Sequence, residues 1–125
     1  MKYLKHYWIS TETGEYLTGT NVHTKRHPES EFDGLDVKIW IKDSDGIDLC
    51  LSQVPDSTTI TNSVVGSKDS VKELTESEYN SVATPYFESQ RCQIDADLLD
   101  GDAKTTKLSE ATSKYADAKT ALNAL

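Results

Sequence analysis

The stretch from residue 39 to residue 51, IWIKDSDGIDLCL, limits the fold of this chain more than any other part of the sequence. Aliphatic residues recur at every second position on both sides of a turn sequence that ends in glycine, which is typical of a β-hairpin. A three-residue loop at positions 44–46, with Gly46 in the left-handed region, sets one register for the two strands. This register pairs Lys42 with Asp48, Ile41 with Leu49, Trp40 with Cys50, and Ile39 with Leu51.

Both faces of this hairpin favour the same register. The aliphatic residues meet on one face, and Lys42 meets Asp48 on the other, where a cross-strand pair of opposite charge contributes about 0.2–1 kcal/mol. A slip of one residue would set Ile41 against Asp48, so the alternation specifies the pairing.

Other short runs in the first half also indicate β-structure. Residues 7–17, YWISTETGEYL, have the same hairpin design, with Gly14 closing the turn. Residues 21–34, NVHTKRHPESEFDG, predict a loop, because proline and glycine interrupt them. After residue 55, STTITNSVV and SVKEL are β-prone runs that would extend the sheet.

The chain changes character near residue 75, where longer segments with helical periodicity begin. Thr75 and Glu78 form a capping box, which predicts a short helix ending near Ala83. Thr84 and Pro85 predict a second start, because proline is favoured in the first turn of a helix. Before a predicted stop at residues 100–102, the positions at helical spacing are Phe87, Arg91, Ile94 and Leu98.

The last segment is the most regular in the chain. Its intervals of three and four residues form the a/d pattern of a coiled-coil seam, at Leu108, Ala111, Tyr115, Ala118, Leu122 and Leu125. We call these six residues the heptad stripe. The stripe is shorter than the three or four heptads of a sustained coiled coil. Two arrangements remain open: an αα-hairpin in which this helix packs on residues 86–99, or contact with another copy or another subunit.

These patterns predict an α+β protein, with antiparallel β-hairpins in the N-terminal part followed by two or three α-helices at the C-terminus. At 125 residues, the chain suits one compact unit with a β-rich platform at 1–74 and a helical segment at 75–125. No stretch approaches the roughly 20 apolar residues of a membrane span. The first twenty residues lack the apolar centre of a secretory signal, so we expect synthesis in the cytoplasm and no membrane partner.

The formal net charge of -8 lies entirely after Lys42. Up to that residue the chain has six Lys or Arg and six Asp or Glu. Beyond it, the chain has seven Lys or Arg and fifteen Asp or Glu. Such an acidic surface repels phosphate backbones, so we expect no nucleic-acid partner. Lys25 and Arg26 form a basic island in the acidic chain, either as part of a solvated loop or as a docking contact for an acidic partner.

Candidate metal ligands are few. Asp43, Asp45 and Asp48 alternate around a glycine, as calcium ligands can, but they lack the glutamate and the 12-residue frame of an EF-hand. The hairpin explains these residues without a metal ion, so calcium is the weaker interpretation.

Catalytic motifs are also missing from the sequence. His23 and His27 could bind zinc together with Cys50 and Cys92, but their sequence distances are unlike those of a compact finger. Buried structural thiols are the favoured interpretation of the two cysteines. The chain contains neither a GxSxG nucleophile elbow nor a glycine-rich phosphate loop. We therefore expect no enzyme activity and no cofactor.

The sequence VKELTESEYNSVATPYFESQ, which begins at Val71, resembles a phrase common in small phage structural proteins. There a short VxxL strand leads into LTExEYN and a helix. KYLKHYWISTETGEYLTG and WIKDSDGIDLCLS are similar in style to virion accessory proteins of marine cyanophages. The resemblance is carried by residues 71–87 and includes no catalytic motif.

The resemblance implies a noncatalytic virion component, such as a head decoration, neck or tail accessory subunit. It would bind other virion subunits or further copies of itself as a homo-oligomer, and it would be located in the virion after assembly in the host cytoplasm. The alternative is a small acidic regulatory protein that binds and inhibits a host enzyme. We expect protein partners to contact the heptad stripe and the basic island at Lys25 and Arg26.

Overall fold

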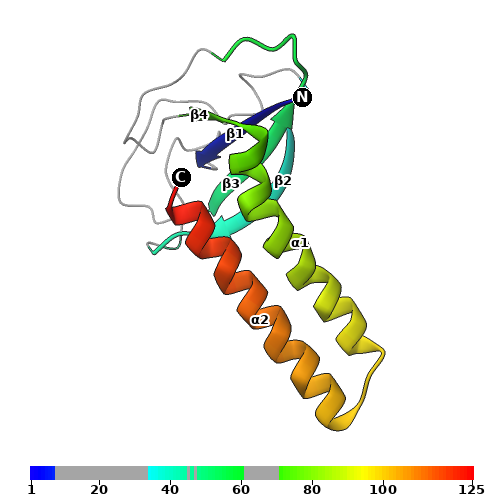
Figure 1. Cartoon of the computed structure of the whole chain (residues 1–125). Helices are drawn as coiled ribbons and strands as arrows, with labels where there is room; N and C mark the ends of the chain where they lie inside the picture. Colours follow the sequence, from blue (N-terminus) through cyan, green and yellow to red (C-terminus); the bar gives the residue numbers. More distant parts are fainter. Residues whose placement is uncertain (8–33, 45, 47, 61–70) are drawn as a thin grey trace. The chain divides into compact units, whose positions relative to one another are not determined.

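The computed structural model describes residues 1–7, 34–44, 46, 48–60 and 71–125. Its elements are β1 (Lys2–Tyr7), β2 (Asp36–Lys42), β3 (Asp48–Val54), β4 (Val71–Leu74), α1 (Glu76–Asp97) and α2 (Gly101–Asn123). In the described residues an antiparallel sheet is followed by two helices, which confirms the predicted α+β class (Figure 1). The chain divides into two compact units, Met1–Glu76 and Ser77–Leu125.

The first unit contains a four-stranded sheet with strand order β2-β3-β1-β4. β2 and β3 form the predicted hairpin, and all four predicted pairs are found. Gly46 has a φ of 81°, and its N–H donates to the carbonyl oxygen of Asp43 at 3.1 Å. Lys42 Nζ lies 2.9 Å from Oδ1 of Asp48. The turn sequence therefore acts as a hairpin loop that sets the register.

β1 lies between β3 and β4, a position that no local sequence pattern indicates. It pairs with β3 along residues Lys2–Tyr7 and with β4 along Tyr3–His6. β3 has a neighbour on each side, and its residues 49–52 are all buried. Leu4, Val54 and Val71 form a core cluster against which two partly buried residues pack, Leu35 and Ile60.

The other β-predictions have different outcomes. SVKEL contains β4, as predicted. Residues 57–60 of STTITNSVV belong to no strand, and the rest of that run lies outside the described residues. The predicted hairpin at residues 7–17 and the predicted loop at 21–34 also lie outside them, apart from Tyr7 in β1 and Gly34.

α1 is one continuous helix, which corrects the predicted break at Thr84 and Pro85. The predicted start is right, because α1 begins directly after Thr75. A proline inside a helix costs about 3 kcal/mol, since it lacks an N–H and crowds the preceding turn. α1 buries one face on both sides of this proline, with Val82 before it and Ser89 after it. Burial of that continuous face offsets the cost of the proline.

The connection between the helices is short. α1 ends at Asp97, and α2 begins at Gly101 with Asp100 as its N-cap. Gly101 has a φ of 61°, a conformation that glycine adopts without strain. The predicted stop at residues 100–102 is therefore also the start of α2. Neither α1 nor α2, the helices in the described part of the chain, is long and apolar enough to span a bilayer.

Candidate functional site

The candidate site is the helical hairpin that α1 and α2 form in the second unit. The hydroxyl of Ser89 donates to the carbonyl oxygen of Ala111 at 2.7 Å, so the two helices are in direct contact. The rings of Tyr86 and Tyr115 lie 6.4 Å apart and add an aromatic contact. The last helix thus packs back on α1, as in the first of the two arrangements that its sequence allowed.

This packing divides the heptad stripe between the inside and the outside of the molecule. Ala111, Ala118 and Leu122 are buried, with 2%, 0% and 1% of their surface exposed. Leu108 and Tyr115 are 42% and 40% exposed, and Leu125 is partly buried. The stripe therefore serves mainly the interior, and two of its large side chains remain on the surface.

The side chains on the buried face of α1 become shorter toward the connection with α2. Its buried residues are Tyr79, Val82, Ala83, Tyr86, Ser89, Cys92 and Ala96. The last three have short side chains, as do Ala111 and Ala118 of α2. Short side chains allow two helix axes to approach closely. The helices thus contact each other through small residues.

Large apolar side chains lie on another side of α1. Phe87, Ile94 and Leu98 are 42%, 61% and 82% exposed. Together with Arg91 they follow one another at intervals of four, three and four residues, which places them on one face of the helix. Arg91 lies two positions from the buried Ser89, about 200° around the helix axis. This face, which we call the outer stripe, therefore points away from α2.

The spacing of the outer stripe in the sequence indicates a helix, but it does not indicate that this face of the helix is exposed. Large apolar residues at helical spacing usually predict the buried face. Here the buried face instead carries Val82, Ser89 and Ala96, at intervals of seven residues. The presence of Arg91 within the apolar spacing was the available signal that this face is exposed.

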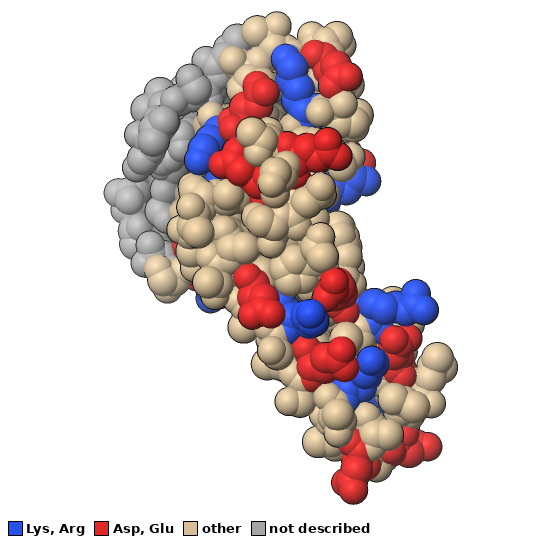
Figure 2. Space-filling view, in the orientation of Figure 1, with Lys and Arg blue, Asp and Glu red and all other residues tan. Residues whose placement is uncertain are grey.

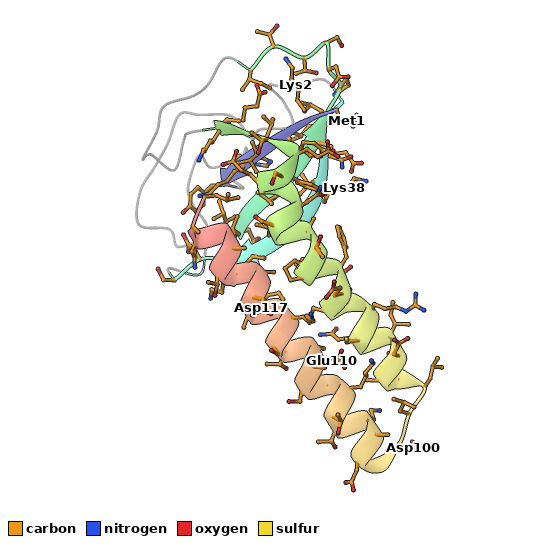
Figure 3. All side chains as sticks on the ribbon, viewed as in Figure 1. Met1, Lys2, Lys38, Asp100, Glu110 and Asp117 are labelled. Atoms are coloured by element: carbon orange, nitrogen blue, oxygen red, sulfur yellow. The ribbon has the colours of Figure 1, made fainter. Side chains whose placement is uncertain are left out.

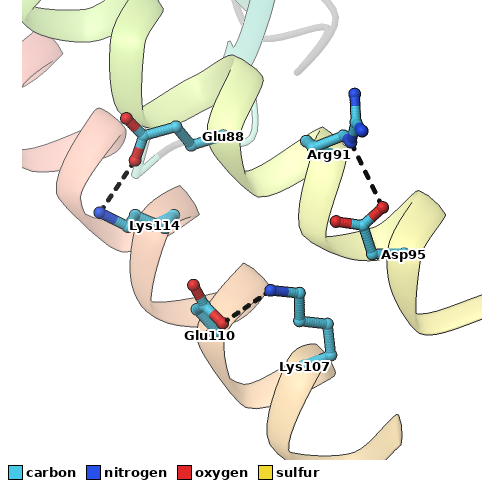
Figure 4. Close-up of polar contacts among 6 residues, drawn as sticks. All are labelled: Glu88, Arg91, Asp95, Lys107, Glu110 and Lys114. Atoms are coloured by element: carbon cyan, nitrogen blue, oxygen red, sulfur yellow. Dashed lines mark hydrogen bonds and ion pairs between the residues drawn. The ribbon is translucent and has the colours of Figure 1, made fainter. Parts of the chain in front are cut away.

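One edge of the hairpin is charged, and its charges are paired within the chain (Figure 4). Glu88 of α1 and Lys114 of α2 form an ion pair of 2.9 Å between the helices. Lys107 Nζ lies 3.2 Å from Glu110 within α2. The hydrogen bond to its carboxylate partner raises the pKa of Lys107 and the pKa of Lys114. Figure 2 shows the resulting mixture of positive and negative side chains over the helices.

The end of the hairpin is acidic. Asp95, Asp97, Asp100 and Asp102 lie within a segment of eight residues, and Figure 3 shows Asp100 at the connection between the helices. Arg91 donates from Nε to Asp95 at 3.3 Å, and its side chain is 78% exposed. An exposed pair of this kind contributes about 0.2–1 kcal/mol, so the outer stripe carries a charged group that is only weakly held.

The sheet contains a buried polar contact that resembles part of a catalytic site. Nε2 of His6 lies 2.6 Å from Oγ of Ser52, and Nδ1 lies 3.2 Å from the carbonyl oxygen of Tyr7. Because a carbonyl only accepts, this geometry places the proton on Nδ1, and the serine hydroxyl donates to Nε2. A Ser–His nucleophile has the same contact. The two side chains are 1% and 0% exposed, however, so a substrate cannot reach the hydroxyl.

The two thiols are unreactive by the same criterion. Cys50 and Cys92 are free and buried. Burial is the main cause that raises the pKa of each thiol, with Asp48 adding to it at Cys50 and Glu110 at Cys92. A thiol is nucleophilic as its thiolate, so both residues behave as the structural thiols that the sequence favoured.

The candidate metal ligands do not form a site in the described part of the chain. Asp48 is engaged by Lys42. Among the residues that the structure describes, no group of three or more His, Cys, Asp or Glu side chains could hold a metal ion. The predicted site residues that lie outside this part are Asp45, His23, His27, Lys25 and Arg26.

The chain matches no protein-family model, and comparisons with curated proteins and with solved structures found no similar protein. The proposed function therefore depends on the surfaces and contacts of the chain itself and on the resemblance of residues 71–87.

Proposed function

We propose that the protein is a noncatalytic component of a phage virion and that its helical hairpin makes contacts with other proteins. The outer stripe is the observation that carries this proposal. Phe87, Ile94 and Leu98 expose apolar surface along one face of α1, with Arg91 among them. An exposed apolar surface with polar surroundings is typical of a site that contacts another protein.

The resemblance to phage structural proteins supports the same part of the molecule. Residues 71–87 contain β4 and the first half of α1, and the outer stripe begins at their last residue, Phe87. The segment that resembles virion proteins thus leads directly into the exposed apolar face.

The buried polar groups support a noncatalytic role. The hydroxyl of Ser52 donates its hydrogen bond inside the sheet, and the raised pKa of Cys50 and of Cys92 keeps both thiols protonated near neutral pH. These three side chains are thus used for packing and internal hydrogen bonding.

Mass spectrometry of gradient-purified particles tests the proposal. We expect peptides of this chain in the particles, at a constant ratio to the major structural proteins across gradient fractions. An abundant nonvirion protein of the same phage serves as the control for contamination. A chain that is abundant in the infected lysate and absent from the particles would contradict the proposal.

An acidic regulator of a host enzyme is a second candidate, and the acidic end of the hairpin is the observation that favours it. Asp97, Asp100 and Asp102 are exposed there and could contact a basic surface. If this function is right, the chain captures one host enzyme in a one-to-one complex and inhibits it. Replacement of the three aspartates by asparagine should then weaken capture at least tenfold, while presence in particles is not expected.

A further inference from the structure

The outer stripe has a spacing that reads the same in both directions. Phe87, Arg91, Ile94 and Leu98 are separated by four, three and four residues, so the pattern is symmetric about a point between Cys92 and Gln93. An antiparallel neighbour with the same stripe would place Phe87 opposite Leu98 and Arg91 opposite Ile94. Each of these contacts would occur twice, as in a two-fold interface.

We infer that the outer stripe binds a second copy of this chain, whose α1 packs antiparallel to the first across a two-fold axis. The inference deepens the proposed function and rests on it in one respect, namely that the helical hairpin is the interacting part. It assigns the partner and the surface. The contact is made by the outer stripe, because three of the six residues of the heptad stripe, Ala111, Ala118 and Leu122, are buried and the heptad stripe does not form a continuous exposed face.

The charges beside the stripe favour the antiparallel arrangement. In the antiparallel pair, Arg91 of one copy lies opposite Ile94 of the other copy. Asp95 follows Ile94 in the sequence, so Arg91 is also close to Asp95 of the other copy. Its guanidinium has five N–H donors, so it can bind this carboxylate and retain the contact with its own Asp95, which uses Nε at 3.3 Å. Within a helix, an ion pair is less favourable when the basic residue precedes the acidic one. The pair between Arg91 and Asp95 of the same chain is therefore weak, and Arg91 can exchange it for a contact with the other copy.

Other pairings of the helices fit less well. A parallel pair of α1 helices would set Arg91 against Arg91 and Asp95 against Asp95. The side of α2 away from the buried Ala111 offers small polar or alanine side chains, which are exposed, at Ser109, Ser113, Ala116 and Thr120. The outer stripe of a second copy therefore complements this stripe better than α2 does, in both hydrophobicity and charge.

Sedimentation equilibrium of the full chain over a wide concentration range tests the inference. We expect a reversible monomer–dimer equilibrium for the unmodified chain. Ile94→Lys should weaken dimer formation at least tenfold, because it places a positive charge opposite Arg91 of the other copy twice. Ala116→Lys adds the same charge on the exposed side of α2 and should leave the equilibrium unchanged. Circular dichroism checks that both variants retain their helices.

A charge exchange tests the polar part of the contact. Arg91→Asp and Asp95→Arg should each weaken self-association at least tenfold, because each sets like charges against each other twice. An equimolar mixture of the two variants restores opposite charges at both positions and should recover the dimer. A mixture that stays monomeric would contradict the predicted contact between Arg91 and Asp95.

Cysteine crosslinking tests the orientation. Chains with Phe87→Cys mixed with chains with Leu98→Cys should form mixed disulfide dimers under mild oxidation. Leu98→Cys chains alone should form few, because the two positions lie far apart in an antiparallel pair. Efficient crosslinking of Leu98→Cys alone would indicate a parallel pair and overturn the inference.

Two further results would also overturn it: an unmodified chain that is monomeric at every concentration, or a dimer that Ile94→Lys leaves intact. A dimer that is absent from purified particles would contradict the virion proposal and leave this inference standing. A chain that is monomeric but present in particles would contradict this inference and support the virion proposal.

Discussion

The sheet and the helical hairpin build their interiors from different residues. The sheet buries large aliphatic side chains, with exposed fractions between 0% and 4%, at Leu4, Ile39, Ile41, Leu49 and Leu51. In the hairpin, the buried residues include small ones, at Ser89, Cys92, Ala96, Ala111 and Ala118, and larger ones, at Tyr79, Val82, Tyr86 and Leu122. The hairpin also places several large apolar residues on the surface, at Phe87, Ile94, Leu98 and Leu108.

This difference shows how one chain can separate stability from recognition. Stability from burial grows with the apolar area removed from water, at about 25 cal/mol per Å², and large side chains supply most of that area in the sheet. Two helices can pack through small residues because their axes then approach closely. The hairpin can therefore keep several of its large side chains on the surface, where they are available for contacts with other proteins.

The largest expected effect comes from removing the same side chain in the two regions. Leu51 on β3 is fully buried, so Leu51→Ala should lower the free energy of unfolding by about 2–5 kcal/mol. Leu98 is 82% exposed, so Leu98→Ala in the monomeric chain should change it by less than about 0.5 kcal/mol. Urea denaturation followed by tryptophan fluorescence and by circular dichroism measures both. Equal losses would mean that the outer stripe is part of the core.

An enlarged side chain tests whether the helices are in close contact. Ala118 is fully buried, so Ala118→Leu should lower the free energy of unfolding by about 1–3 kcal/mol through overpacking. Ala116→Leu makes the same change at an exposed position of α2 and should have little effect. Urea denaturation followed at 222 nm compares the two. A stable Ala118→Leu chain would show that the interface has room for large residues.

Alkaline pH should affect stability through the buried thiol of the sheet. Burial raises the pKa of Cys50 above its usual value of 9.0, whereas the thiol of the unfolded chain ionises near that value. Only the unfolded chain then releases this proton, so stability falls as the pH rises above 9, by up to about 1.4 kcal/mol per pH unit. Urea denaturation between pH 8 and pH 10 should show a smaller decline for Cys50→Ala. An identical decline would contradict the assignment.

The smallest effect is expected at the hairpin turn. Lys42 and Asp48 are paired at 2.9 Å, with 63% and 23% of their side chains exposed. Their coupling energy should be about 0.2–1 kcal/mol, because water screens exposed charges. A double-mutant cycle with Lys42→Met and Asp48→Asn, measured by urea denaturation, gives this value directly. A coupling above this range would contradict the expectation that water screens this pair.

The hairpin of β2 and β3 could be predicted in full because its information is local. The alternation of apolar residues and one glycine determine both the loop and the pairs, and Gly46 adopts the predicted conformation. The start of α1 after Thr75 is local in the same sense. The pairing of β1 is different, because its partners in β3 and β4 are distant in sequence. The residues of β1 alone do not indicate which strands lie beside it.

The candidate site was predictable only in part. The heptad stripe correctly indicated a helix with one apolar side, and Ala111, Ala118 and Leu122 are buried as such a pattern indicates. The spacing of Phe87, Ile94 and Leu98 indicated another helical face with equal strength. Periodicity shows which residues share a face, but it does not show which face meets a neighbour.

The sequence by itself determined the elements whose causes lie within a few residues: the hairpin register, the turn at Gly46, and the helical character of the last fifty residues. Only the tertiary structure decided that β1 enters the middle of the sheet and that α1 continues through Pro85. It also decided that small residues face inward between the helices. The physical reason is that burial is a property of assembled elements, so the energy that selects a buried face or offsets a proline arises only when those elements pack together.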